Sequence, residues 1–205
     1  MPAASPERTE ARRRQVLDAA VELFSECGYR ATSMHGLAAR VGLSKPALYH
    51  YVQSKERVLV ELYEEVLHES VTAVHAIAAS ELDVAAALRE VIVQRVAYTC
   101  EKRNLLRVFF EEEAELPRPM LRTVLRDRRA YEDALLALVA RGVQEGVFVL
   151  PCTPRVFVNA VLGAANWVYK WYDPAGALSP RELGAQIADA MLAGLSSGVR
   201  PVGRK

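Results

Sequence analysis

Cysteine is scarce in this sequence, which has only Cys27, Cys100 and Cys152 among its 205 residues. The number is odd and the three lie far apart, so they suit neither a disulfide framework nor a metal site built from closely spaced ligands. We therefore expect three reduced structural thiols, with Cys27 as a small core residue at the end of the first helix, and no metal.

Long apolar runs are also missing, although 51% of the residues are hydrophobic. No run is long enough to cross a bilayer, and no signal-peptide pattern precedes Arg12. We expect a cytoplasmic protein with no membrane partner. The chain length allows either one large core or a small head joined to a larger body.

Catalytic motifs are few. The sequence has neither a glycine-rich phosphate loop nor a serine at a strand-to-helix elbow. Glu65 and His68 have the Glu-x-x-His spacing of carboxylate-bridged di-metal bundles, but such bundles need two of these pairs and two further glutamates. We expect neither an enzyme nor a bound cofactor, and a helical-bundle enzyme remains a remote alternative.

Helical signals run along the whole chain, and no segment alternates convincingly as a strand would. Capping residues, prolines and glycines divide it into about nine helices, so the predicted fold is all-α: a three-helix head and a larger helical body. The first predicted helix ends at Gly28. The others span 34–41, 45–51, 54–79, 83–103, 104–114, 119–146, 153–172 and 179–196.

The segment from Arg30 to Arg57 predicts a helix-turn-helix. Gly42 suits a helix end, and Ser44 is placed to cap the next helix, which has Pro46 in its first turn. That second helix carries short, polar and aromatic side chains that suit a DNA major groove. A glycine turn between two amphipathic helices also occurs in helical proteins of other kinds. The predicted DNA contacts are Thr32, Ser33, Ser44, Lys45, Pro46, Ala47, Tyr49, His50 and Lys55, with Lys55 on a phosphate.

The charge distribution favours the same interpretation. Residues 1–57 hold nine Lys or Arg and six Asp or Glu, a net charge of +3, whereas the remainder has a net charge of −2. The cluster Arg12-Arg13-Arg14 is placed to reach DNA phosphates, or it forms part of a solvated arm. We expect residues 1–8 to be disordered.

The stretch TSMHGLAARVGLSKPALYHYVQSKE resembles the DNA-binding head of the TetR family of repressors. The family pattern has a Thr-rich start, an Ile-Ala-x-x-Ala-Gly-Val-Ser turn, a Leu-Tyr-x-His/Tyr-Phe helix and a Ser-Lys-Glu step. Leu37, Pro46 and Tyr51 depart from it, and Pro46 lacks a backbone donor for phosphate. The resemblance implies a DNA-binding domain over 1–57, a ligand-binding and dimerisation domain over 58–205, and a repressor acting on a palindromic operator.

The last two predicted helices suggest how such a protein dimerises. Residues 155–172 are apolar almost all round, which a surface helix of a monomer would not tolerate. Together with the last helix they look like half of a symmetric four-helix interface, as the resemblance also implies. The alternative is that the tryptophans are ordinary core, and the two interpretations do not exclude each other. The predicted interface residues are Gly163, Trp167, Trp171, Leu183, Ile187 and Met191.

Asn166 and Lys170 lie one turn apart in the same apolar helix, so they either reach solvent or line a polar spot in a ligand cavity. The run Asn-Trp-Val-Tyr-Lys-Trp-Tyr-Asp-Pro-Ala-Gly resembles a TetR branch that answers to acyl-CoA thioesters in fatty-acid, aromatic or steroid degradation. The resemblance implies an acyl-CoA effector, and a drug-sensing repressor of an efflux pump is the alternative. The acidic run 109–115 and the basic run 126–131 form either solvated helix faces or walls of a cavity between helices. The predicted ligand-site residues are Phe109, Glu113, Arg129, Tyr131, Asn166 and Lys170.

Overall fold

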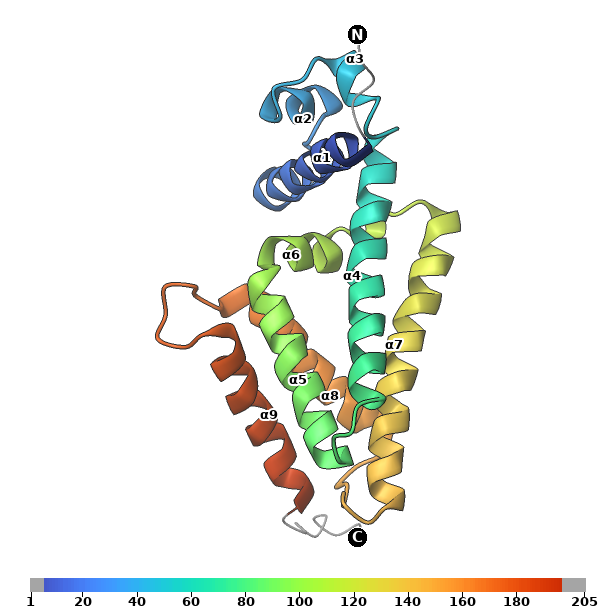
Figure 1. Cartoon of the computed structure of the whole chain (residues 1–205), viewed down its shortest axis with the longest axis vertical. Helices are drawn as coiled ribbons and strands as arrows, with labels where there is room; N and C mark the ends of the chain where they lie inside the picture. The colour runs from blue at the N-terminus through green and yellow to red at the C-terminus, as the bar shows by residue number, and fades with distance from the viewer. Residues whose placement is uncertain (1–5, 197–205) are drawn as a thin grey trace. The chain divides into compact units, whose positions relative to one another are not determined.

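A computed structural model describes residues 6–196 of the chain, and the described part is helical throughout, as the sequence predicts. Figure 1 shows the order of the helices along the chain. One short 3-10 helix follows α6. The elements are α1 (Pro6–Cys27), α2 (Met34–Arg40), α3 (Lys45–Leu48), α4 (Lys55–Ala78), α5 (Val84–Glu101), α6 (Arg103–Glu111), η1 (Glu113–Glu115), α7 (Arg118–Gln144), α8 (Pro154–Trp171) and α9 (Pro180–Ser196).

These elements form two compact units. The first unit contains the described residues up to Val66 together with Asn104–Val124. The second contains Leu67–Arg103 and the described residues from Leu125 onward. The first unit therefore holds the helix-turn-helix together with most of α6, all of η1 and the first turns of α7.

Side-chain caps start the helices where the sequence predicts them. The hydroxyl of Ser33 accepts from the Gly36 amide at 3.0 Å, and the Asp83 carboxylate accepts from the Ala86 amide at 2.8 Å. At α9 the Glu182 carboxylate accepts from the Ser179 amide at 2.8 Å, and the Glu182 amide donates back to the Ser179 hydroxyl at 3.3 Å. Such caps satisfy amides that have no partner within the helix.

Two expectations about the first helix are wrong. Helix α1 begins at Pro6, so residues 6–8 are helical rather than disordered, and residues 1–5 lie outside the described part. Cys27 is exposed, because Tyr29 rather than Cys27 continues the buried stripe and packs edge-on against Phe24 at 5.2 Å between ring centroids. Cys152 is exposed as well, whereas Cys100 is buried, and burial raises the pKa of its thiol to about 11.

The core of the second unit forms where α5 packs against α8 and α9 (Figure 1). Gly184 lets α9 come close to α5, because a Cβ atom at this position would lie 2.7 Å from the carbonyl oxygen of Val93. Two ion pairs join the same helices at the surface. Arg89 pairs with Asp189 at 2.7 Å, and Arg181 pairs with Glu90 at 2.9 Å.

This close approach predicts that Gly184→Ala destabilises the second unit. The added methyl group would meet the backbone of α5, and overpacking of this kind costs about 1–3 kcal/mol. Gly36→Ala in α2 is the control, since a Cβ there meets only the Ser33 hydroxyl at 3.5 Å, an ordinary van der Waals distance, and alanine favours a helix. Chemical denaturation measures both variants. Equal stability of Gly184→Ala and the wild type would contradict the prediction.

Candidate DNA-binding surface and effector site

The helix-turn-helix is built around three buried side chains. Leu37 and Ala38 of α2 and Leu48 of α3 are each at most 2% exposed. Between the helices Gly42 has a φ of 66°, a left-handed conformation that glycine adopts without steric cost. Helix α3 is shorter than predicted and ends at Leu48, with residues 49–51 continuing in turns.

The other side of α3 is open to solvent. Tyr49 is 45% exposed, the side chains of Lys45, Pro46 and His50 are exposed, and Ala47 is half-buried. Ser33 and Ser44 stand exposed at the first turns of α2 and α3, where their hydroxyls cap the helices. The surface therefore offers one cation, two hydroxyls, an imidazole and a phenol beside a small residue, a set that can read base edges and hold phosphates.

Thr32 does not fit the role predicted for its side chain. It is 7% exposed, and its hydroxyl donates to the carbonyl oxygen of Gly28 at 3.0 Å. A buried hydroxyl held in this way cannot meet DNA. Thr32 instead fixes the turn between α1 and α2.

The sequence also predicts that Lys55 contacts a phosphate. In the structure its ammonium group contacts other residues of the same chain instead. The Nζ atom donates to the carbonyl oxygens of Tyr29 at 2.8 Å and Thr32 at 2.9 Å, and it lies 4.2 Å from the centroid of the Tyr29 ring. An ammonium group has only three donors, and these contacts use two of them. Lys55 therefore holds the turn between α1 and α2 rather than presenting a free cation.

The three arginines of the α1 cluster have different partners. Arg13 pairs with Glu61 at 2.7 Å, and Arg14 makes two contacts with Glu65 at 2.7 and 3.0 Å. The α4 carboxylates thus offset two of the three charges. Arg12 donates to the carbonyl oxygen of Val41 at 2.8 Å and keeps its charge at the surface.

A shallow hollow lies beside Arg12 in the first unit. Two arginines, a glutamine and a tyrosine line it, which is a composition suited to a DNA backbone. Sequence reasoning missed Arg8 and Tyr51 as candidates, because their positions in the chain do not reveal that the start of α1 meets the end of the helix-turn-helix. The lining residues are Arg8, Ala11, Arg12, Gln15 and Tyr51.

The segment that follows α6 also contacts the turn after α1. The Glu112 carboxylate accepts from the Tyr29 amide at 2.9 Å, and Glu115 pairs with Arg30 at 2.8 Å. All four residues belong to the first unit. Burial and the nearby glutamates raise the pKa of Tyr29 to about 12, so its phenol stays neutral at physiological pH.

The predicted effector residues do not form one group. Phe109 is buried in the first unit, where it packs 4.7 Å from the Tyr63 ring, and Glu113 lies in η1 of the same unit. Arg129 and Lys170 are exposed on α7 and α8. The ammonium of Lys170 lies 5.2 Å from the centroid of the Tyr169 ring.

Tyr131 and Asn166 do come together in the second unit, and they meet at Arg95, which sequence reasoning overlooked. Arg95 is 6% exposed; its Nε atom donates to Asn166 at 2.9 Å, and its guanidinium carbon lies 5.7 Å from the centroid of the Tyr131 ring. The signal was available, since Arg95 is the one basic residue in the otherwise apolar and neutral run Val91–Cys100. An arginine in such a run has to be accommodated inside the core.

The predicted dimer residues lie on two different surfaces. Trp167 and Trp171 of α8 are 59% and 53% exposed, and Gly163 lies on the same exposed side. Leu183 is buried in the core of the second unit, and Ile187 and Met191 pack against that core. The core of the chain itself therefore covers Leu183, which cannot meet a second chain, whereas Ile187 and Met191 are only half-buried. The exposed stripe of α9 consists instead of Gln186, Ala190, Ala193 and Gly194.

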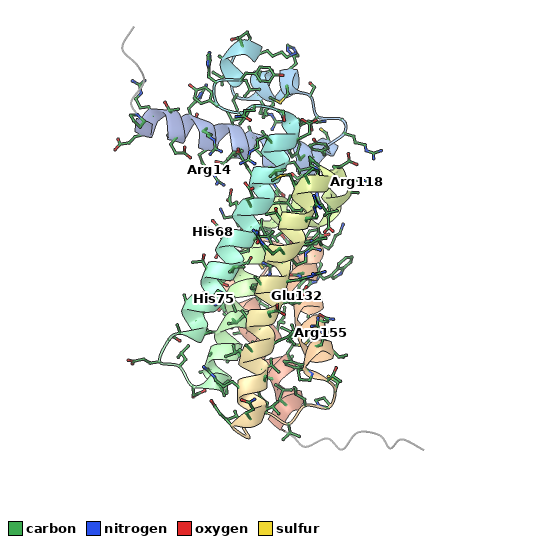
Figure 2. The ribbon with its side chains drawn as sticks, turned by 90° about the vertical axis from the view of Figure 1, so that its right-hand side faces the viewer. Arg14, His68, His75, Arg118, Glu132 and Arg155 are labelled. Atoms are coloured by element: carbon green, nitrogen blue, oxygen red, sulfur yellow. The ribbon has the colours of Figure 1, made fainter. Side chains whose placement is uncertain are left out.

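Candidate metal ligands do not gather in the described part of the chain. His68 and His75 are both exposed on α4, as Figure 2 shows. Glu65, the carboxylate of the Glu-x-x-His spacing, is occupied by Arg14. Residues 6–196 contain no group of three His, Cys, Asp or Glu side chains that could hold an ion, and no described helix is long and apolar enough to span a membrane.

Comparison with known proteins places these features in a family. Residues 16–62 match the family model of bacterial regulatory proteins of the tetR family, which covers the helix-turn-helix. Residues 81–195 match the model of the tetracyclin repressor-like C-terminal domain. The second match alone covers more than half of the chain.

Individual relatives agree along nearly the whole length. The transcriptional repressor KstR2 of Rhodococcus jostii is 25% identical over 187 residues, which are 91% of this chain and 92% of that protein. The TetR family regulator PfmR of Thermus thermophilus is 32% identical with a TM-score of 0.81, over 88% of this chain and 98% of its own. AibR, solved with isovaleryl coenzyme A and operator DNA, is 26% identical with a TM-score of 0.75, over 90% and 97%.

The two domain matches and the exposed helix-turn-helix therefore lead to one conclusion. The chain belongs to the TetR family of bacterial regulatory proteins, and it is a DNA-binding transcriptional repressor of that family rather than an enzyme.

Proposed function

We propose that this repressor binds a palindromic operator as a homodimer in the cytoplasm and that an acyl-CoA thioester releases it. The exposed side of α3 and the turn after it support the DNA-binding surface, with Lys45, Tyr49 and His50 exposed beside the half-buried Ala47. A twofold dimer would present two such surfaces to the two half-sites of a palindrome. Ser33, Ser44 and Pro46 complete the proposed contact surface.

Lys45 and Lys55 give a matched pair of substitutions. Lys45→Ala removes an exposed cation, so it should leave stability unchanged and weaken operator binding by about 1–3 kcal/mol. Lys55→Met removes the two short contacts with Tyr29 and Thr32, so it should lower the free energy of unfolding by about 1–3 kcal/mol. Mobility-shift titrations over a range of salt and chemical denaturation measure the two effects. A fully stable Lys55→Met protein with weakened DNA binding would restore the phosphate role.

The exposed side of α8 supports the proposed dimer. Val156, Trp167 and Trp171 are each more than half exposed, and a single surface helix rarely leaves so much apolar area in water. Gly163 and Ala160 on the same side would allow close approach of a second helix. We propose that this side, together with the exposed small-residue stripe of α9, pairs with its copy in a second chain.

Gly163→Arg tests this interface. A Cβ atom at Gly163 meets nothing within 4 Å in the single chain, so the large side chain should leave the fold intact and obstruct only the partner. We expect monomers or aggregates by light scattering and loss of operator binding, with Gly163→Ala as the control that retains the dimer. A Gly163→Arg dimer of wild-type affinity, or a wild-type monomer at micromolar concentration, would remove the interface from α8.

Similarity to AibR supports the class of the effector, because AibR was solved with both isovaleryl coenzyme A and operator DNA. In the present chain the exposed Lys170 lies beside the Trp167 and Tyr169 rings, 5.9 and 5.2 Å from their centroids. A cation flanked by aromatic rings suits the phosphates and adenine of a CoA moiety. We propose this role for Lys170, with Asn166 and Tyr131 nearer to the acyl group. Phe109, Glu113 and Arg129 remain candidates for the cavity wall.

An effector moves the equilibrium only by the difference in its affinity for the two states of the repressor. Weakening of operator binding by some tens of times requires a preference of about 2 kcal/mol per dimer. The effector must therefore bind the form with low affinity for DNA better than the operator-bound form.

An operator-release assay tests the effector class. We expect acyl-CoA thioesters to release the operator at micromolar concentration and CoA alone to act weakly, because it lacks the acyl group. Lys170→Ala should raise the thioester concentration needed for release while operator binding without effector stays unchanged, and Lys170→Arg is the control that retains the charge. Release by uncharged lipophilic compounds alone would favour the drug-sensing alternative.

A further inference from the structure

Arg95 is a buried arginine inside the second unit. Its side chain projects from the middle of α5 and is 6% exposed. The residues before and after it on the same helix, Val91, Ile92 and Val96, belong to the apolar core. Arginine does not lose its proton in proteins, so a full positive charge lies in these surroundings.

The described part of the chain provides no negative partner for this charge. The guanidinium makes two hydrogen bonds, one from Nε to Asn166 and one from Nη1 to Ser70, each 2.9 Å long. Both acceptors are neutral. Among the described residues 6–196, no carboxylate lies within ion-pair distance of Arg95, whereas other arginines of the unit, such as Arg89 and Arg181, have one.

Two tyrosine rings flank the guanidinium without replacing a counter-ion. The ring centroids of Tyr98 and Tyr131 lie 5.8 and 5.7 Å from the guanidinium carbon. Burial raises the pKa of Tyr131, an effect that the Arg95 charge opposes only in part, so its phenol stays protonated and carries no charge. Rings stabilise a cation partly, but an unpaired charge in an apolar core remains unfavourable.

The unused N–H donors of Arg95 indicate which chemical group would fit as its partner. A guanidinium has five N–H groups in one plane, and the two hydrogen bonds use one on Nε and one on Nη1. Three donors are left, including both on Nη2. Two neighbouring donors of a guanidinium match the two oxygens of a carboxylate, and this bidentate pair is among the strongest that arginine forms.

We propose that Arg95 is the recognition site for a carboxylate carried on an apolar effector. The charge selects an anion rather than a neutral carbonyl, since neutral acceptors are already present and leave the charge unbalanced. The planar donors select a carboxylate. The Tyr98 and Tyr131 rings beside the guanidinium, and the core residues that precede and follow Arg95 in α5, select an apolar body. The carboxylate belongs either to a free acid or to the far end of a dicarboxylyl-CoA, in which case the inference rests on the proposed function.

The first experiment uses the wild-type protein and pairs of probes that differ only in charge. Octanoate is compared with octanamide, and adipyl-CoA with hexanoyl-CoA, by the rise in melting temperature. In at least one pair, we expect the carboxylate to bind at least tenfold more tightly than its neutral counterpart. If neither carboxylate binds more tightly than its counterpart, the proposal is overturned.

The second experiment changes Arg95. Arg95→Met should abolish the preference for the carboxylate probe, and Arg95→Lys should retain part of it, because the charge remains but the planar pair of donors does not. Arg89→Met is the matched control, since Arg89 lies on the same helix and already pairs with Asp189; it should keep the full preference. An unchanged preference in Arg95→Lys and Arg95→Met overturns the proposal.

Stability without a ligand separates this role from a structural one. An arginine kept for a ligand leaves its charge unbalanced in the free protein, so Arg95→Met should melt no lower than Arg89→Met. A structural arginine would show the opposite, with a large loss of melting temperature in Arg95→Met only, and that result counts against the proposal.

The outcomes also separate this proposal from the acyl-CoA effector. If octanoate binds in a way that depends on Arg95 and no thioester releases the operator, the carboxylate site is supported and the thioester effector is contradicted. A different result is that hexanoyl-CoA and adipyl-CoA release the operator at equal concentrations, both in the wild type and in Arg95→Met. That result supports the thioester effector and contradicts the carboxylate site. Preference for adipyl-CoA that depends on Arg95 supports both.

Discussion

The contacts of one ammonium group organise the DNA-binding unit. Lys55, at the start of α4, donates to two carbonyl oxygens of the turn between α1 and α2 and lies over the ring of Tyr29. These carbonyls belong to residues outside a helix, and that of Tyr29 also accepts from the Thr32 amide at 3.2 Å. By satisfying them, Lys55 ties the end of α1 to the beginning of α4, and the position of α2 and α3 follows from that connection.

The features that were predicted correctly are those set by neighbouring residues. The caps of α2, α3, α5 and α9 are made by a side chain three residues before the amide that it accepts from, so sequence spacing alone locates them. The left-handed Gly42 ends α2 for a similarly local reason. The helix-turn-helix and the all-helical fold could therefore be derived before any coordinates were known.

The wrong predictions concern contacts between residues far apart in the sequence. Lys55 looked like a surface cation, because its partners precede it by 23 and 26 residues. Leu183 looked like an interface residue, because helical spacing gives a stripe but not the helix that covers it, which is α5. Arg95 could have been predicted in part. Its burial could have been expected from its apolar neighbours, but its neutral partners Ser70 and Asn166 could not.

The contact between Glu112 and Tyr29 has a consequence for genetics. The donor is the main-chain amide of Tyr29, which every residue except proline carries, so substitutions of that side chain leave the donor in place. The acceptor, by contrast, depends on a glutamate at position 112. Random mutagenesis should therefore remove this contact through many substitutions at codon 112, whereas at codon 29 only a change to proline removes the donor.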